Sequence, residues 1–170
     1  MPVTFDKISS ITVGSGGATN IEFTSISTNF TDLVLKISAR NTSAVNNYDM
    51  VIRFNGDSGS NYNVRAIQGD GSSATTFTSG LQASLYNINI PGNNLNSNLF
   101  SNTEIYIPNY QASTSKTVFI STTTEDNSTS TGLIRVLSGL WTGTASISSI
   151  TLFQNFAQYS SATLYGIKKP

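Results

Sequence analysis

The 170-residue chain contains neither cysteine nor histidine. Without cysteine there is no disulfide framework, no thiolate nucleophile and no thiolate metal site. Without histidine the chain lacks the usual general base near neutral pH and the commonest transition-metal ligand. Ser-His-Asp and Cys-His catalysis therefore cannot be built from this chain alone.

Charge is also scarce, because only 11% of the residues are charged and the formal net charge is +0. Soluble domains carry roughly 25% charged residues. No basic run could follow a phosphate backbone, so we expect no nucleic-acid partner. Lys168-Lys169 is the largest basic cluster, and we interpret it as a solvated tail. A neutral surface rich in Ser, Thr and Asn suits close packing against neighbouring proteins.

Targeting and membrane signals are missing as well. Met1–Lys7 has neither a basic region nor an apolar region of the kind found in signal peptides. No apolar run approaches the roughly 18 residues of a transmembrane helix. We therefore expect a soluble protein made in the cytoplasm, with no membrane partner.

What the sequence does contain is apolar–polar alternation with period two, in segments rich in Val, Ile, Thr, Tyr and Phe. In Asp32–Arg40, Leu33, Leu35 and Ile37 share one face, while Val34 and Lys36 share the other. Such alternation is the signature of strands. About ten short strands separated by Gly, Asn and Ser turns predict one domain over residues 1–170. The expected fold is an all-β, antiparallel, jelly-roll-like β-sandwich.

Carboxylates offer the remaining route to catalysis or metal binding. Glu125-Asp126 lies in a polar turn, which favours a solvated loop over an acid/base pair. The turn 55–61, with Asp57, has oxygen ligands of the kind calcium prefers but lacks a known calcium-loop spacing. Glu104 and Asp57 form the best catalytic pair that the sequence offers. We predict no enzyme activity, no catalytic residue, no cofactor and no metal.

Several other residues are candidates for contact with a partner or ligand. Arg53 and Arg65 could hold an anion together, although pairing with Asp49, Asp57 or Glu104 is favoured. Trp141 follows an apolar segment, which favours a core or subunit-contact role over a sugar platform. The uncharged segment 92–100 could become ordered on docking. The full set of candidate contacts is Arg53, Tyr62, Arg65, Leu95, Phe100, Tyr110 and Trp141.

An ordered series of segments between Phe5 and Ile167 resembles a family of small proteins encoded among the structural genes of tailed bacteriophages. The segments are Phe30–Leu35, Ile52–Tyr62, Glu104–Tyr110, Gly139–Trp141, Ile147–Leu152 and Ser161–Ile167. The resemblance implies a virion component with a β-sandwich fold that works as an oligomer. It supplies no catalytic residues.

Three functions follow as expectations. The first is a non-enzymatic capsid decoration or cement protein that binds other virion proteins, the major capsid protein above all. Virion geometry then favours a homotrimer. The second is a tail-fibre or receptor-binding module that recognises host glycans through Asn-, Gln- and Thr-rich loops and exposed tyrosines. The third is a tail or baseplate component. In each case the protein would be made in the host cytoplasm and end in the virion.

Overall fold

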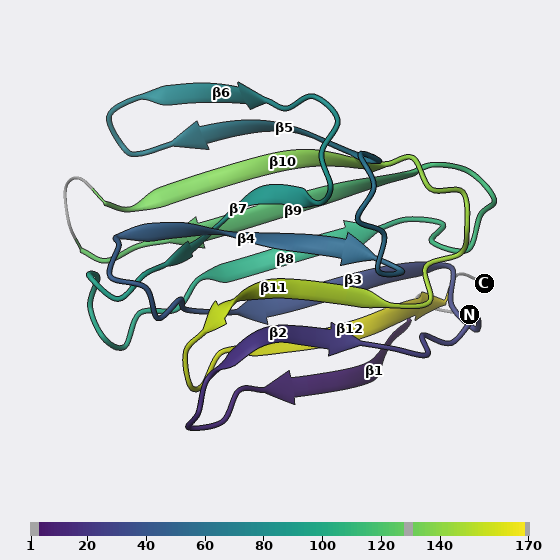
Figure 1. The fold of residues 1–170 in the computed structure, drawn as a ribbon, viewed down its shortest axis with the longest axis horizontal. Coiled ribbons are helices and arrows are strands. Elements are labelled where there is room, and N and C mark those ends of the chain that lie inside the picture. Colours follow the sequence, from purple (N-terminus) through teal and green to yellow (C-terminus); the bar gives the residue numbers. More distant parts are fainter. Residues whose placement is uncertain (1–3, 128–130, 169–170) are drawn as a thin grey trace.

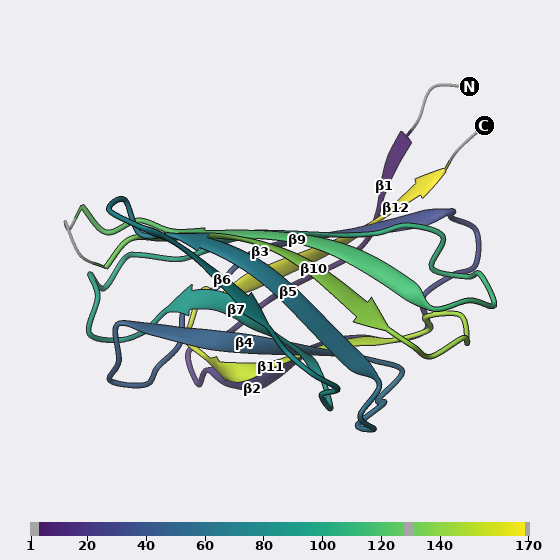
Figure 2. The same ribbon diagram turned by 90° about the horizontal axis from the view of Figure 1, so that it is seen from above.

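The computed structural model describes residues 4–127 and 131–168, and these residues form strands without any helix. Twelve strands form two antiparallel sheets that lie face to face, as Figure 2 shows from above. The predicted all-β sandwich is therefore confirmed.

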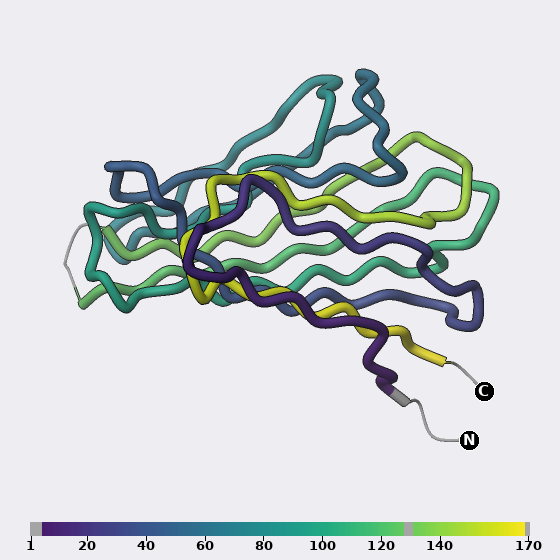
Figure 3. Tube along the Cα trace, turned by 60° about the horizontal axis from the view of Figure 1, so that its bottom comes forward, coloured from purple at the N-terminus to yellow at the C-terminus, as the bar shows by residue number. Residues whose placement is uncertain are grey.

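The two sheets differ in size. The larger has eight strands in the order β1 (Thr4–Thr12), β12 (Ser161–Lys168), β3 (Asp32–Ser38), β8 (Asn102–Ile107), β9 (Lys116–Thr124), β10 (Leu133–Trp141), β5 (Tyr62–Gly69) and β6 (Ala74–Thr78). The smaller has four in the order β2 (Ala18–Phe23), β11 (Ile150–Phe156), β4 (Asn47–Phe54) and β7 (Leu85–Pro91). The first and last strands pair side by side, with Phe5 opposite Ile167 (Figure 3).

The period-two pattern explains which side chains enter the core. On β3, Leu33, Leu35 and Ile37 are buried against the small sheet, whereas Lys36 and Ser38 are exposed. On β4, the same alternation buries Met50, Ile52 and Phe54 and leaves Arg53 pointing outward. Burial of such side chains stabilises the fold by about 1.5–3 kcal/mol each, so the interface between the sheets is the dominant stabilising element.

The large sheet extends well beyond the small one. Beyond β8, the strands β9, β10, β5 and β6 add one after another to the sheet, and β6 forms its upper edge in Figure 1. On the inner side, β7 packs against β9, β10 and β5. The outer face of these added strands is not covered by any other described element.

Two differences from the sequence prediction have physical causes. Strand β6 was not predicted, because Ala74–Thr78 is exposed at every residue and so shows no buried face in its sequence. The alternation predicts a strand over Ile147–Phe153, but β11 starts at Ile150, because the amides of Ser148 and Ser149 donate to the Asn55 side chain.

Candidate interaction surface

The outer face of the large sheet carries an exposed apolar cluster on β5, β9 and β10. Its members are 52%, 51%, 58% and 36% exposed in the order Ile67, Phe119, Ile134 and Val136. We call these four residues the apolar outer patch. Each belongs to the outward-facing set of its strand. The neighbouring residues Ala66, Val118, Ile120 and Leu137 are buried, and Arg135 reaches Asp49 of the small sheet.

The strand register brings the four side chains together. Val136 lies directly opposite Ile67 on β5 and opposite Ser121 on β9. Phe119 is therefore a diagonal neighbour of Val136, within reach of an aromatic side chain. Ile134 precedes Val136 by two residues and lies on the same face of β10. The patch is thus contiguous across three neighbouring strands.

Around Ile67, Phe119 and Val136 the surface is polar, and Arg65 is the one charged residue in the lining. A shallow hollow of about 500 Å³ lies over Ile67, Phe119 and Val136, and it is rimmed by Thr76, Thr78, Ser138 and Arg65. An apolar centre inside a polar rim is the usual anatomy of a protein-binding surface. Because the hollow is open rather than enclosed, it suits contact with a flat protein surface.

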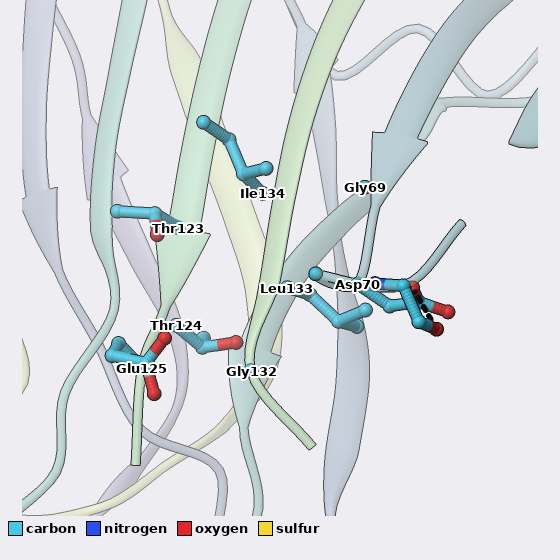
Figure 4. Close-up of a pocket in the computed structure, with 10 residues that line it drawn as sticks. Gly69, Asp70, Thr123, Thr124, Glu125, Gly132, Leu133 and Ile134 are labelled. Atoms are coloured by element: carbon cyan, nitrogen blue, oxygen red, sulfur yellow. Dashed lines mark hydrogen bonds between the residues drawn. The ribbon is translucent and has the colours of Figure 1, made fainter. Parts of the chain in front are cut away.

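A second hollow of about 500 Å³ lies at the turn end of the same strands (Figure 4). Its two carboxylates do not converge, since Asp70 and Glu125 lie on opposite sides of Leu133 and Gly132 in the figure. Asp70 accepts hydrogen bonds from the amides and hydroxyls of Ser72 and Ser73, which hold the pKa of its carboxyl well below the ordinary value. The two acids are therefore not arranged as an acid/base pair.

The acidic residues considered from the sequence lie in separate environments. Glu125 accepts a bond from the Asn127 amide, and Asp126 accepts one from Thr131. Glu104 pairs with Lys36 on the outer face, whereas Asp57 lies in the β4–β5 turn. Within residues 4–127 and 131–168, no three acidic side chains gather into a metal-binding group.

Asp57 has a structural role in its turn. Its carboxylate accepts hydrogen bonds from Trp141 Nε1 at 2.7 Å, from Asn61 Nδ2 at 2.9 Å and from the Gly59 amide at 2.9 Å. The indole N–H is the main reason that the pKa of Asp57 lies below its ordinary value. N–H donors thus occupy the oxygens that a calcium ion would need.

Three of the aromatic or apolar candidates belong to the core. Tyr62 and Tyr110 are fully buried, and Trp141 is 3% exposed. Trp141 packs against Phe54 and Tyr62 with ring centroids 5.6 and 6.4 Å away. These side chains do not reach the surface, so burial removes them from the set of candidate contacts. For Trp141 this is the core role that the sequence favoured.

The two arginine candidates belong to different sheets. Arg53 lies on the outside of the small sheet, where its Nε donates to the Ala83 carbonyl and its guanidinium lies 5.2 Å from the centre of the Phe153 ring. Arg65 is exposed on the large sheet and reaches Thr78. They do not form a joint anion site. Of their expected partners, Asp49 pairs with Arg135 at 2.6 Å and Glu104 pairs with Lys36.

The segment 92–100, which the sequence suggests could become ordered on docking, makes hydrogen bonds within the single chain. The buried guanidinium of Arg40 donates to the carbonyls of Asn96 at 2.6 Å, Leu99 at 3.1 Å and Leu95 at 2.8 Å. Leu95 is buried beneath the loop and Phe100 is half-buried. Sequence reasoning missed Arg40 because it stands at the end of a strand, where a charged residue is expected to face water.

A second buried cation, Lys116, bonds to the loop before β9 and to the loop between β10 and β11. Lys116 Nζ donates to the carbonyls of Ala112, Thr114 and Ala145 and lies 5.5 Å from the centre of the Trp141 ring. Burial lowers its pKa. At the end of the described chain, Lys168 pairs with Asp6 at 3.0 Å, whereas Lys169 lies outside the described residues.

The apolar outer patch was also missed, although its signal was present in the sequence. Leu133–Trp141 alternates between two sets that are both largely apolar, rather than between an apolar and a polar set. A strand that is apolar on both faces is either covered on both or exposes one for a partner. The sequence could not decide between these cases.

No protein-family model, curated protein or solved structure matches the chain. The described residues include no helical segment with the length and hydrophobicity needed to span a membrane.

Proposed function

We propose that the protein is a non-enzymatic structural component of a phage virion that docks on other virion proteins, most specifically as a capsid decoration protein. The apolar outer patch is the observation that carries this proposal. An apolar centre with a polar rim suits attachment to a broad protein surface. The resemblance to phage structural proteins supplies the kind of particle.

The mechanism is mass action. A protein that binds the assembled shell and not its dissociated subunits stabilises the shell by the free energy of that binding. Because Arg65 is the one charged residue that lines the hollow over Ile67, Phe119 and Val136, attachment there rests on apolar burial, and we expect it to vary little with ionic strength. After synthesis in the host cytoplasm the protein would end in the virion.

Strand order supports a jelly-roll interpretation of the sandwich. Without β5, β6, β9 and β10, the two sheets read β1-β12-β3-β8 and β2-β11-β4-β7. This interleaving of early and late strands in two four-stranded sheets fits an eight-stranded double Greek key. The four remaining strands are two hairpin insertions, and they hold the whole apolar outer patch. The docking surface would thus be an addition to a common scaffold.

The experiment is reconstitution on purified particles. Shells stripped of the protein are incubated with wild-type chain, with Ile134→Asp, or with Thr19→Asp, which alters an exposed residue of the small sheet. We expect Ile134→Asp to lose most binding and Thr19→Asp to keep it. Equal binding of both variants, or particles that carry this chain in only a few copies, would exclude decoration. A few copies confined to the tail would favour the tail or baseplate function instead.

Glycan recognition is a second candidate, favoured by Tyr159. This residue is 68% exposed at the β11–β12 turn and holds a φ of 71°, a backbone conformation that aromatic residues rarely adopt. An exposed aromatic ring can stack on a sugar. Binding to host polysaccharide that Tyr159→Ala abolishes would support this function, and silence of the intact wild type across those polysaccharides would exclude it.

A further inference from the structure

Strand β6 is an open sheet edge without the usual protection. All five of its residues, Ala74 to Thr78, are exposed, and none is charged or proline. Its pairing with β5 runs without a bulge. An edge of this kind presents unpaired N–H and C=O groups to any strand that approaches, and folded proteins normally block it. In Figure 1 the edge lies free at the top of the molecule.

The other three sheet edges do carry protective features. β1 has a bulge between Lys7 and Ser9 and a charge pair between Asp6 and Lys168. β2 carries an exposed carboxylate, Glu22. These bulges and charges are devices that discourage strand addition.

The fourth edge, β7, is covered by side chains of the large sheet. Arg135 Nη1 donates to the Asn87 carbonyl at 3.2 Å, and Thr122 Oγ1 donates to the Asn89 carbonyl at 2.8 Å. Pro91 ends the strand. Of the sheet edges described in this structure, β6 is therefore the one that no bulge, charge, proline or covering side chain protects from pairing with another strand.

The hydrogen bonds at both ends of the β5–β6 hairpin show which β6 groups are free. The Ser79 amide donates to the Val64 carbonyl, and the Ser73 carbonyl accepts from the Asp70 amide. The backbone N–H and C=O groups of Ser73 and Ser79 therefore point toward β5. In an antiparallel pair the direction of the backbone groups alternates from residue to residue. The N–H and C=O groups of Ala74, Thr76 and Thr78 consequently point away from β5, to the free edge.

We propose that two copies of this chain associate by antiparallel pairing of β6 with β6 around a two-fold axis at Thr76. In this register Thr76 bonds to its own counterpart, and Ala74 of each copy bonds to Thr78 of the other. All three outward-pointing residues are then satisfied in both copies. A shift of register in either direction leaves at least one of them unpaired.

Identical strands fit this arrangement because a two-fold contact must be self-complementary. β6 has no charge that would repel its counterpart. Arg65 lies beside Thr78, which faces the partner's Ala74, and Ala74 in turn lies beside Gly69. The two arginines therefore stay at opposite ends of the joined strands. The two eight-stranded sheets become one continuous sheet, and the symmetry is two-fold rather than the three-fold suggested by virion geometry.

Proline substitutions test both the contact and its register. Thr76→Pro removes an N–H that points to the free edge, so the monomer keeps its β5–β6 ladder. At the axis this substitution deletes two intermolecular bonds, and we expect dimerisation to weaken about thirtyfold, or about 2 kcal/mol. Thr75→Pro removes an N–H that points to β5, so it should lower the unfolding temperature much more than Thr76→Pro does. Equal thermal effects of the two prolines would overturn the assigned register.

Sedimentation velocity over a range of concentrations measures the association itself. We expect a wild-type dimer that Thr76→Pro and Thr76→Lys shift to monomer, while Thr19→Lys, a matched change on the β2 edge, leaves it intact. Spin labels on Thr76→Cys should show strong dipolar broadening in the dimer, because the labelled Cα atoms lie about 5.5 Å apart. A wild type that stays monomeric, forms a trimer, or dimerises equally well with both Thr76 variants would overturn the proposal.

Discussion

Trp141 Nε1 donates a hydrogen bond of 2.7 Å to Asp57 Oδ2, and this bond ties the end of β10 to the turn between β4 and β5. Trp141 is the last residue of β10 in the large sheet, whereas Asp57 lies in the turn that joins β4 of the small sheet to β5 of the large sheet. The buried indole ring packs against both Phe54 and Tyr62, which also contact each other, while its N–H reaches the turn. The bond therefore fixes the end of β10 to the turn that connects the small sheet with the large one.

Asp57→Asn should destabilise the fold by about 1–3 kcal/mol, since the buried indole N–H then loses a charged acceptor. The pKa of Asp57 is lowered in the folded state, so its contribution is present above about pH 3.8 and is lost as pH falls through the folded pKa. Urea denaturation at neutral and acidic pH measures both effects. A double-mutant cycle with Trp141→Phe isolates the pair. Additive single effects would show that the bond itself contributes nothing.

Arg40→Met should release the loop 92–100 while leaving the sheets folded. The substitution keeps an apolar stem but removes the donors to Leu95, Asn96 and Leu99, each worth about 0.5–1.5 kcal/mol or more. Hydrogen exchange should increase in residues 93–100. Arg65→Met, at an exposed site, is the control and should leave exchange unchanged. Full protection of the loop in Arg40→Met would contradict the role given to this cation.

Gly139→Ala should destabilise the sandwich by about 1–3 kcal/mol through overpacking. A Cβ at this position would lie 2.7 Å from Val118 Cγ2 and 2.9 Å from Leu85 Cδ2, inside the core. Gly80→Ala is the matched control, because a Cβ there meets nothing within 4 Å. Thermal unfolding compares the two variants. Val118→Ala in the Gly139→Ala background should recover part of the loss, and failure to do so would argue against steric conflict.

Alkaline pH should destabilise the fold through Tyr62. Burial raises the pKa of its hydroxyl to about 12, above its ordinary value of 10.0. A raised pKa means that this stability is complete below pH 10 and is lost as pH rises through about 12. Lys116 acts in the opposite sense, because burial lowers its pKa and the penalty on its charge is relieved as pH approaches 10.5.

The difference between wild type and Tyr62→Phe separates these two groups. Denaturant midpoints between pH 9 and pH 12 should fall less steeply in Tyr62→Phe, which cannot ionise at this position. Burial also raises the pKa of Tyr110, but this residue is present in both proteins. Its effect therefore cancels in the difference between their midpoints. Parallel pH profiles for the two proteins would show that Tyr62 ionises as freely in the fold as outside it.

Much of the fold could be predicted because one sheet face is buried on most strands. The alternation in β4, and in β3 apart from the buried Val34, reports that burial directly. It fails for β6, which has no buried face, and for β10, which is apolar on both faces. In each case the deciding factor is the neighbouring element, which a local sequence pattern does not contain.

The candidate site was harder to predict for a related reason. Tyr62, Tyr110 and Trp141 carry polar groups that suggest ligand contacts, but each satisfies its group inside the fold. Tyr62 bonds to Phe54, Tyr110 to the Ser27 carbonyl and Trp141 to Asp57. Ile67 and Phe119 look like core residues and are exposed. Side-chain chemistry alone does not reveal exposure when both faces of a strand are apolar.

The protection of β1, β2 and β7 also limits how large an assembly held together by strand pairing can become. A pair joined through β6 has no second open edge of that kind to offer. Growth by strand addition therefore stops at two copies, and a protein of low charge that would otherwise risk forming fibres is restricted to a closed, finite assembly.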